Sequence, residues 1–472
     1  MPDETRDPVT GVGKEHRANV SIRGSSPMWP HLVILLSVGI ALRTTYRIAR
    51  KMLLLGSVEG HFVYAYGHAL EGRVWFPFLI VFAPACGLAW LTTRKIATRE
   101  RACVLAWWVA AFPSQLVLRV LAFEPLEASI RSDSSNSFYT PTLSSTALDF
   151  LGNFQRQAEA LPMHAAANMP GKVLLYYLLE TMTSAPQVMG YANILLSNLG
   201  GVFLYFIVRD LFGDRRTALY SLILYLFIPG RTYFFPLANT VTPTVVLACL
   251  FLHVRFLVTG RSIYALGLGV GLYVMLLFDP IPLATGPIFV AAFLNSRLPT
   301  CNTPAAAIRT ASRATLLGAA AFVAVYATVL VSTGFDIAGC FWTVLANAQD
   351  FNAQNKRDYT LWAMRNPVDF CITAGVAVVP LALAAVLEAA RSPVQLRALA
   401  TFGIATVLAF VALDAAGVNR GEVMRLWIFQ AAFFAVLAAW TCARVRGSLT
   451  FYLVLGVNIL QAAVGLDVVR FL

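Results

Sequence analysis

The chain has 472 residues, of which 58% are hydrophobic and only 13% are charged. A soluble chain of this length would carry about a quarter of its residues as charged ones, so the composition excludes an ordinary soluble domain. The formal net charge of +12 is typical of loop lysines and arginines that fix membrane topology, and it predicts no nucleic-acid partner.

The chain begins with a polar segment, residues 1–28, that lacks the apolar core of a cleavable signal peptide. We predict a disordered tail there, followed by one transmembrane domain over 29–472. The seven cysteines are scattered and form no CxxC pair, so the sequence predicts neither a disulfide scaffold nor a zinc site.

Apolar runs long enough to cross a hydrocarbon core of about 30 Å recur along the domain. They lack the alternating pattern of barrel strands, so helices are expected and the fold class is an all-α polytopic transmembrane bundle. About thirteen spans are predicted, at 30–48, 75–93, 102–122, 188–208, 217–235, 239–257, 263–279, 281–295, 313–333, 368–387, 397–414, 423–442 and 449–468.

Short basic loops between these spans set the predicted orientation, because Lys and Arg favour the cytoplasmic side. The arginine-containing loops at 94–101, 209–216, 255–261, 297–313, 391–397 and 444–446 all alternate correctly with the spans. The opposite, extracytoplasmic side then receives 123–187, 236–238, 279–280, 334–367 and 414–422, with 123–187 as a long first outer loop and 334–367 as a second.

Two segments are ambiguous. Residues 171–185 are apolar but too short to cross comfortably at about 1.5 Å per residue, so we predict an interfacial or re-entrant helix there. Residues 52–70 either belong to a loop or form an extra short span, and the side on which the tail lies depends on that choice.

Acidic residues gather in the predicted outer segments, whereas the inner loops hold only Glu100, Asp210, Asp214 and Glu388. The first outer loop has an acidic start that includes Asp133, then an amphipathic stretch and His164. Pro170-Gly171-Lys172 then opens the short helix. A helix N-terminus with a nearby Lys suits a phosphate group.

These features resemble the GT-C superfamily of integral membrane glycosyltransferases, in uncharacterised bacterial members. The similarity covers roughly 120–430. It is carried by the acidic first outer loop with Asp133 and by four further segments: Leu161 to Gly171, which is similar to a run ending in His-Pro-Pro-Gly; Arg209-Asp-Leu-Phe-Gly213; Asn366-Pro-Val-Asp-Phe370; and Arg420-Gly-Glu-Val-Met-Arg-Leu-Trp427. Asn168 and Met169 stand where that family run has His and Pro.

The resemblance implies transfer of a sugar from a polyprenyl-phosphate donor, on the extracytoplasmic face of a bacterial cell membrane, to a glycan, lipid or protein acceptor. Asp133 is expected as the base and His164 as a catalytic contact. The expected phosphate-binding and substrate-binding residues are Asn168, Lys172, Arg420, Glu422 and Arg425, because guanidinium groups bind phosphate in a bidentate manner. No cofactor is predicted with certainty, and a divalent cation is left open.

Two alternatives remain. A transporter or flippase for a lipid or lipid-linked sugar would place ionisable groups near the middle of the membrane, whereas the polar residues here lie mostly in outer loops. A catalytically degenerate GT-C homologue would account for Asn168 and Met169.

Overall fold

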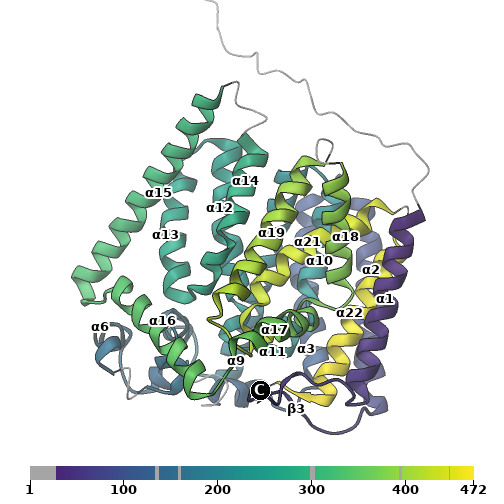
Figure 1. Cartoon of the computed structure of the whole chain (residues 1–472), viewed down its shortest axis with the longest axis horizontal. Helices are drawn as coiled ribbons and strands as arrows, with labels where there is room; N and C mark the ends of the chain where they lie inside the picture. The colour runs from purple at the N-terminus through teal and green to yellow at the C-terminus, as the bar shows by residue number, and fades with distance from the viewer. Residues whose placement is uncertain are drawn as a thin grey trace, which may run out of the picture.

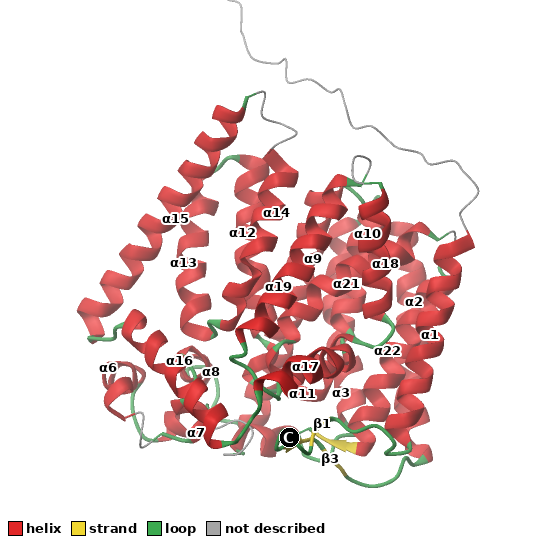
Figure 2. Ribbon diagram, in the orientation of Figure 1, coloured by secondary structure: helices red, strands yellow, loops and turns green. Residues whose placement is uncertain are grey.

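The structure is a computed structural model, and it describes residues 28–132, 138–157, 161–297, 303–392, 396–445 and 447–471. Nearly all regular structure in these ranges is helical (Figure 2), and the strands are two-residue segments. The prediction of an all-α membrane protein is therefore confirmed. The polar tail at 1–28 falls almost wholly outside the described residues.

Within the part of the chain that the structure describes, eight helical segments are long and apolar enough to cross a membrane. They are α1 (Met28–Ala49), α2 (Trp75–Lys95) with the preceding turn η1 (Gly72–Val74), α3 (Glu100–Arg119), α9 (Pro186–Phe212), α12 (Thr242–Thr259) with the preceding turn η4 (Ala238–Thr240), α15 (Pro304–Thr333), α19 (Arg397–Ala416) and α22 (Leu449–Val468). A ninth span results if α17 (Tyr359–Ala374) and α18 (Val378–Arg391), which are bent by 103°, form one broken crossing.

The other predicted spans coincide with shorter helices. They are α10 (Arg215–Leu226) with α11 (Pro229–Phe234), α13 (Ser262–Phe278), η5 (Ile281–Thr285) with α14 (Gly286–Arg297), and α20 (Val423–Leu426) with α21 (Ile428–Arg444). Each of the longer ones packs on other helices, α10 on α9 and α21, and α13 on α12 and α15. The number thirteen remains a prediction.

One end of the bundle carries most of the short elements, and Figures 1 and 2 show them together along its lower edge. We call it the loop end. It holds α6 (Ala147–Gln157), α7 (Met163–Ala166), α8 (Gly171–Glu180), α16 (Ile337–Gln354) and α17. Nearby in the sequence, α4 (Leu126–Arg131) packs on α9, and η2 (Thr140–Leu143) packs on α8. The elements of 123–187 and of 334–367 thus lie at the same end of the molecule.

A separate apolar core positions the described elements between residues 138 and 180. Phe150 and Phe154 of α6, Tyr176 of α8 and Cys340 of α16 are buried in this core, together with Tyr273 of α13. Burying these side chains together fixes α8 against α13 and α16. The predicted short helix in 171–185 is present as α8, which has ten residues.

Residues 52–70 form strands, so the alternative of an extra span there is wrong. β1 (Gly56–Ser57) pairs antiparallel with β2 (Phe62–Val63), and β3 (Ala65–Tyr66) pairs antiparallel with β4 (Val469–Arg470). Gly56 has φ 86° and His61 has φ 58°, and these positive angles allow the chain to reverse within a few residues.

The opposite end of the bundle is rich in arginine, and Glu100, Asp210 and Glu388 form ion pairs there. Asp214 caps the start of α10, where it accepts from the backbone N–H groups of Arg216 and Thr217. Arg209 lies 3.0 Å from Glu100 and 2.6 Å from Asp210, and Arg255 lies 3.1 Å from the other oxygen of Asp210. Arg444 pairs with Glu388 at 2.9 Å. The four acids of the predicted inner loops therefore lie at the end away from α16 and α17.

Candidate functional site

Two adjoining cavities lie at the loop end. The first chamber, of about 130 Å³, is lined by parts of α7, α16 and the turn before α20, together with Asp279. The second chamber, of about 500 Å³, is lined by β2, β3, Phe234 and the residues around β4. Both are also lined by the same five residues: His164, Phe351, Arg357, Glu422 and Arg425.

One face of α16 forms the apolar wall of the first chamber. Phe341 lies three and four residues before Val344 and Leu345, and Ala348 lies four and three residues after them, which places these side chains on one side of a helix. The same face continues to Asn352, whose amide donates to the carbonyl oxygen of Val418 at 2.9 Å. The chamber therefore has an apolar wall that becomes polar toward residues 417–426.

The turn at 417–422 supplies the charged wall. Gly417, Gly421 and Glu422 all have positive φ, at 59°, 81° and 58°. Glycine adopts that region readily, whereas Glu422 is held there by its surroundings. Asn366 fixes the turn by donating to the carbonyl oxygen of Asn419 at 3.0 Å.

Arg420 links this turn to the chain between α16 and α17. Its guanidinium donates to the carbonyl oxygens of Gly417 at 3.1 Å and Arg357 at 2.9 Å, and Arg357 donates back to the carbonyl oxygen of Arg420 at 2.8 Å. Arg420 also lies over the ring of Tyr359 at 5.5 Å. These contacts bring two distant parts of the sequence together at the cavity.

Glu422 lies between two arginines, and we call the three residues the triad. Its carboxylate oxygens are 3.0 Å from Arg357 and 2.5 Å from Arg425, and all three side chains are at least 85% buried. Burial alone would raise the pKa of Glu422, but the positive charges of Arg425 and Arg357 outweigh it and hold that pKa below its ordinary value. Glu422 is therefore ionised at neutral pH and organises the two guanidiniums.

A buried ion pair lies beside the first chamber. Lys172, at the start of α8, is fully buried 3.1 Å from Asp279, which follows α13. Asp279 also accepts from the Thr242 hydroxyl at 3.2 Å and from the backbone N–H of Ile281 at 3.2 Å. Asp279 lines the chamber, whereas Lys172 lies behind it.

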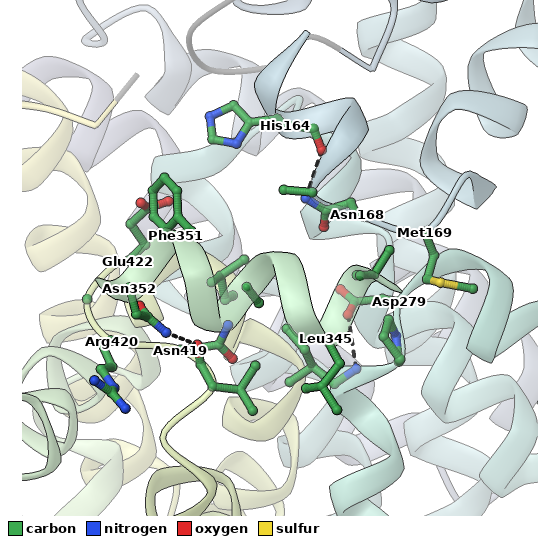
Figure 3. Close-up of a pocket in the computed structure, with 18 of the residues that line it drawn as sticks. His164, Asn168, Met169, Asp279, Leu345, Phe351, Asn352, Asn419, Arg420 and Glu422 are labelled. Carbon is green, nitrogen blue, oxygen red and sulfur yellow. Dashed lines mark hydrogen bonds between the residues drawn. The ribbon is translucent and has the colours of Figure 1, made fainter. Parts of the chain in front are cut away.

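His164 and Asn168 cover the chamber from the side of α7. The Asn168 amide donates to the carbonyl oxygen of His164 at 2.9 Å, and Lys172 donates to the Asn168 side-chain oxygen at 3.2 Å. Figure 3 shows His164 and Glu422 facing the same cavity from different segments. The positive charge that His164 carries when protonated also favours ionisation of Glu422.

The structure brings together most of the residues predicted from the sequence. His164, Asn168, Arg420, Glu422 and Arg425 all line the first chamber. Lys172, predicted as a phosphate contact, is instead buried against Asp279, and the first residue of α8 packs on the end of α13. Asp133, the predicted base, lies outside the described residues.

Sequence reasoning missed Arg357, Asn352 and the Lys172–Asp279 pair. The spacing of Phe341, Val344, Leu345 and Ala348 is a helical signal that would have marked α16 as a wall. Arg357 stands three residues beyond the end of that helix and next to Lys356, but two basic residues in a loop do not by themselves indicate a site.

The charges that line the first chamber favour an anion. Arg357, Arg420 and Arg425 are cationic, Glu422 is the carboxylate among them, and Asp279 is already neutralised by Lys172. Among the described residues, no group of three or more His, Cys, Asp or Glu side chains is placed to hold a metal ion. Comparisons with protein-family models, with curated proteins and with solved structures find no match to this chain.

Proposed function

We propose that the protein is a membrane glycosyltransferase that moves a sugar from a polyprenyl-phosphate donor to an acceptor at the loop end. The observation that carries this proposal is the amphipathic first chamber, in which the apolar face of α16 meets the guanidinium groups of Arg357, Arg420 and Arg425. A polyprenyl-phosphate sugar has the matching polarity, an apolar chain joined to an anionic phosphate. The loop end then faces the extracytoplasmic side of a bacterial cell membrane.

In this proposal the two arginines of the triad and Arg420 bind the phosphate. As the bond from the sugar to the phosphate breaks, negative charge grows on the phosphate oxygen, and preorganised guanidinium groups stabilise that charge. Glu422 keeps Arg357 and Arg425 in place, since it is ionised and pairs with both. Asp133 is the proposed base for the acceptor hydroxyl, and His164 contacts the donor or the acceptor from α7.

A transporter or flippase of a lipid-linked sugar is the second candidate. The broken crossing α17–α18, bent by 103°, favours it, because discontinuous helices line substrate sites in many transporters. Glycosyl transfer remains the better-supported function, since the charged residues line a cavity at one end of the bundle. A catalytically degenerate homologue would bind the donor without transferring the sugar.

The test uses the full chain in lipid nanodiscs and measures binding of polyprenyl phosphate, followed by sugar release from polyprenyl-phosphate sugars. Arg357→Gln removes a buried charged hydrogen-bond donor and is expected to weaken binding of the lipid phosphate about tenfold or more. Leu345→Trp fills the first chamber and is expected to weaken binding of the lipid phosphate by a similar factor. Ala346→Trp, on the exposed side of α16, is the matched control.

Arg131→Gln controls for loss of a positive charge at the loop end, because Arg131 lies on the surface of α4. If Ala346→Trp and Arg131→Gln weaken binding of polyprenyl phosphate as much as Leu345→Trp and Arg357→Gln do, the proposed site is refuted. Binding without sugar release from any donor would favour the degenerate homologue, and movement of intact lipid-linked sugar between leaflets would favour the transporter.

A further inference from the structure

The second chamber is a separate compartment that the donor lipid does not occupy in the proposal above. Its walls come from Phe62 to Ala65 of the strand region, from Phe234 of α11, and from Arg470 with Phe471. Its volume of about 500 Å³ lies within the range of about 300 to 1,000 Å³ that is usual for small-molecule sites. The pairing of β3 with β4 holds these walls together.

The charges of the second chamber are mostly positive. Arg357, Arg425 and Arg470 line it together with His164, and Glu422 is the carboxylate among its lining residues. Glu422 already interacts with both Arg357 and Arg425, so one carboxylate is shared between two guanidiniums. Arg470 is solvent-exposed, and its guanidinium lies 5.2 Å from the centre of the Phe123 ring, so it adds positive charge at the rim. Such a lining attracts an anionic ligand.

Aromatic rings form the remaining wall. Tyr64 lies 5.0 Å from Phe62, 6.1 Å from Phe234 and 5.5 Å from Phe471, measured between ring centroids. Ring faces are electron-rich and attract the weakly positive C–H groups of a saccharide. Burial raises the pKa of Tyr64 above its ordinary value, so its hydroxyl stays protonated. The wall therefore offers flat apolar faces beside guanidinium groups.

Taking glycosyl transfer as the function, we propose that the second chamber holds the acceptor and that the acceptor is an anionic saccharide, a sugar bearing a carboxylate or a phosphate. Its sugar rings lie on the aromatic wall, and its negative group pairs with Arg470 at the rim. This ligand class rests on the proposed function, whereas the chamber itself is defined by its own walls.

The shared residues explain how the two substrates meet. His164 and the triad line both chambers, so an acceptor hydroxyl in the second lies next to a donor phosphate in the first. The acceptor oxygen forms a bond to the anomeric carbon of the donor sugar. The bond from that carbon to the phosphate oxygen breaks, its electron pair leaves with polyprenyl phosphate, and the hydroxyl proton passes to the carboxylate base.

The test measures binding of three probes to the full chain in nanodiscs by titration calorimetry: glucose 6-phosphate, glucuronate and glucose. The two anionic sugars are expected to bind at least tenfold more tightly than glucose. Arg470→Gln is expected to weaken them at least fivefold while leaving binding of polyprenyl phosphate unchanged, because Arg470 lines the second chamber and not the first. Leu345→Trp is expected to weaken binding of polyprenyl phosphate and to leave binding of the anionic sugars unchanged. Arg131→Gln is expected to change neither.

The outcomes separate the two proposals. If polyprenyl phosphate binds as expected but glucose binds as tightly as the anionic sugars, or Arg470→Gln changes nothing, the acceptor class is wrong and the proposed function stands. If polyprenyl phosphate does not bind, the proposed function fails and the acceptor assignment fails with it. Binding of glucose 6-phosphate without glucuronate, lost in Arg470→Gln, supports the proposal and narrows the acceptor to a phosphorylated saccharide.

Discussion

Replacing Lys172 by Met tests whether the buried ion pair with Asp279 is structural. The two charges are 3.1 Å apart and their side chains are 0% and 3% exposed. At an effective dielectric constant of about 20, their attraction is about 5 kcal/mol. Lys172→Met removes that attraction and leaves a buried carboxylate without its cation, so the free energy of unfolding is expected to fall by about 3 to 5 kcal/mol.

The assay is detergent-induced unfolding in mixed micelles, with two comparisons. Lys172→Met combined with Asp279→Asn removes both charges and is expected to recover most of the lost stability. Arg131→Met breaks a pair with a similar separation, 3.0 Å to Glu127, but these side chains are 60% and 49% exposed. That variant is expected to lose less than about 1 kcal/mol.

Lys172→Met also tests the prediction from the sequence that Lys172 binds the donor phosphate. If it lowers binding of polyprenyl phosphate while the free energy of unfolding changes by less than about 0.5 kcal/mol, Lys172 acts on the ligand. The structural reasoning would then be refuted, because a buried carboxylate cannot lose its cation at so small a cost.

Three further predictions concern Glu422, Gly171 and Asp133. The arginines hold the folded-state pKa of Glu422 below its unfolded value, so its stabilising effect is complete above about pH 4.3 and is lost as the pH falls through the lowered value. Glu422→Gln should therefore lower stability at pH 7 and flatten the acid side of a stability-versus-pH curve. An unchanged acid side would contradict this. Gly171→Ala would place a Cβ 2.5 Å from the carbonyl oxygen of Leu277, so a loss of about 1 to 3 kcal/mol is expected in unfolding experiments, whereas Gly72→Ala meets no atom within 4 Å and should be nearly neutral. Asp133→Asn is expected to reduce sugar transfer by about 10² to 10⁴-fold with unchanged donor binding, and normal transfer would remove Asp133 from the reaction.

Hydropathy predicted the bounds of a long helix well where the apolar run extends from one end of the helix to the other. The predicted span 449–468 matches α22 (Leu449–Val468). Where they do not coincide, the prediction differed for a physical reason. α15 begins at Pro304, nine residues before the predicted span, because the polar turns that carry Arg309 and Arg313 are helical as well.

Breaks inside apolar runs were not predicted. The run 368–387 bends at Gly375, where φ is 98° and a Cβ would meet the Asn458 side chain at 2.8 Å. Gln461 of α22 satisfies the opened backbone there, donating to the carbonyl oxygen of Ile372 at 2.7 Å and accepting from the N–H of Val376 at 3.0 Å. Such a break depends on a distant side chain, which periodicity along one segment does not show.

The sequence predicted only part of the candidate site, because some of its residues meet partners that are distant in sequence. Arg420, Glu422 and Arg425 stand in one short segment, so a local motif was enough to find them. The partners Arg357 and Asp279 lie far away in sequence, and only packing reveals that Arg357 meets Glu422 and that Asp279 meets Lys172. Five of the residues predicted from the sequence nevertheless line one chamber, because their segments meet at the same end of the bundle.

The pairing of β3 with β4 has a consequence for synthesis. A ribosome releases the chain in order, so Ala65 and Tyr66 emerge some 400 residues before their partners Val469 and Arg470. Until then β3 has no partner strand, and the compartment lined by Phe62, Tyr64 and Phe471 lacks the wall that Phe471 supplies. The strand that closes the compartment is therefore made after all of the described helices, and the compartment takes its final form only once they have been synthesised.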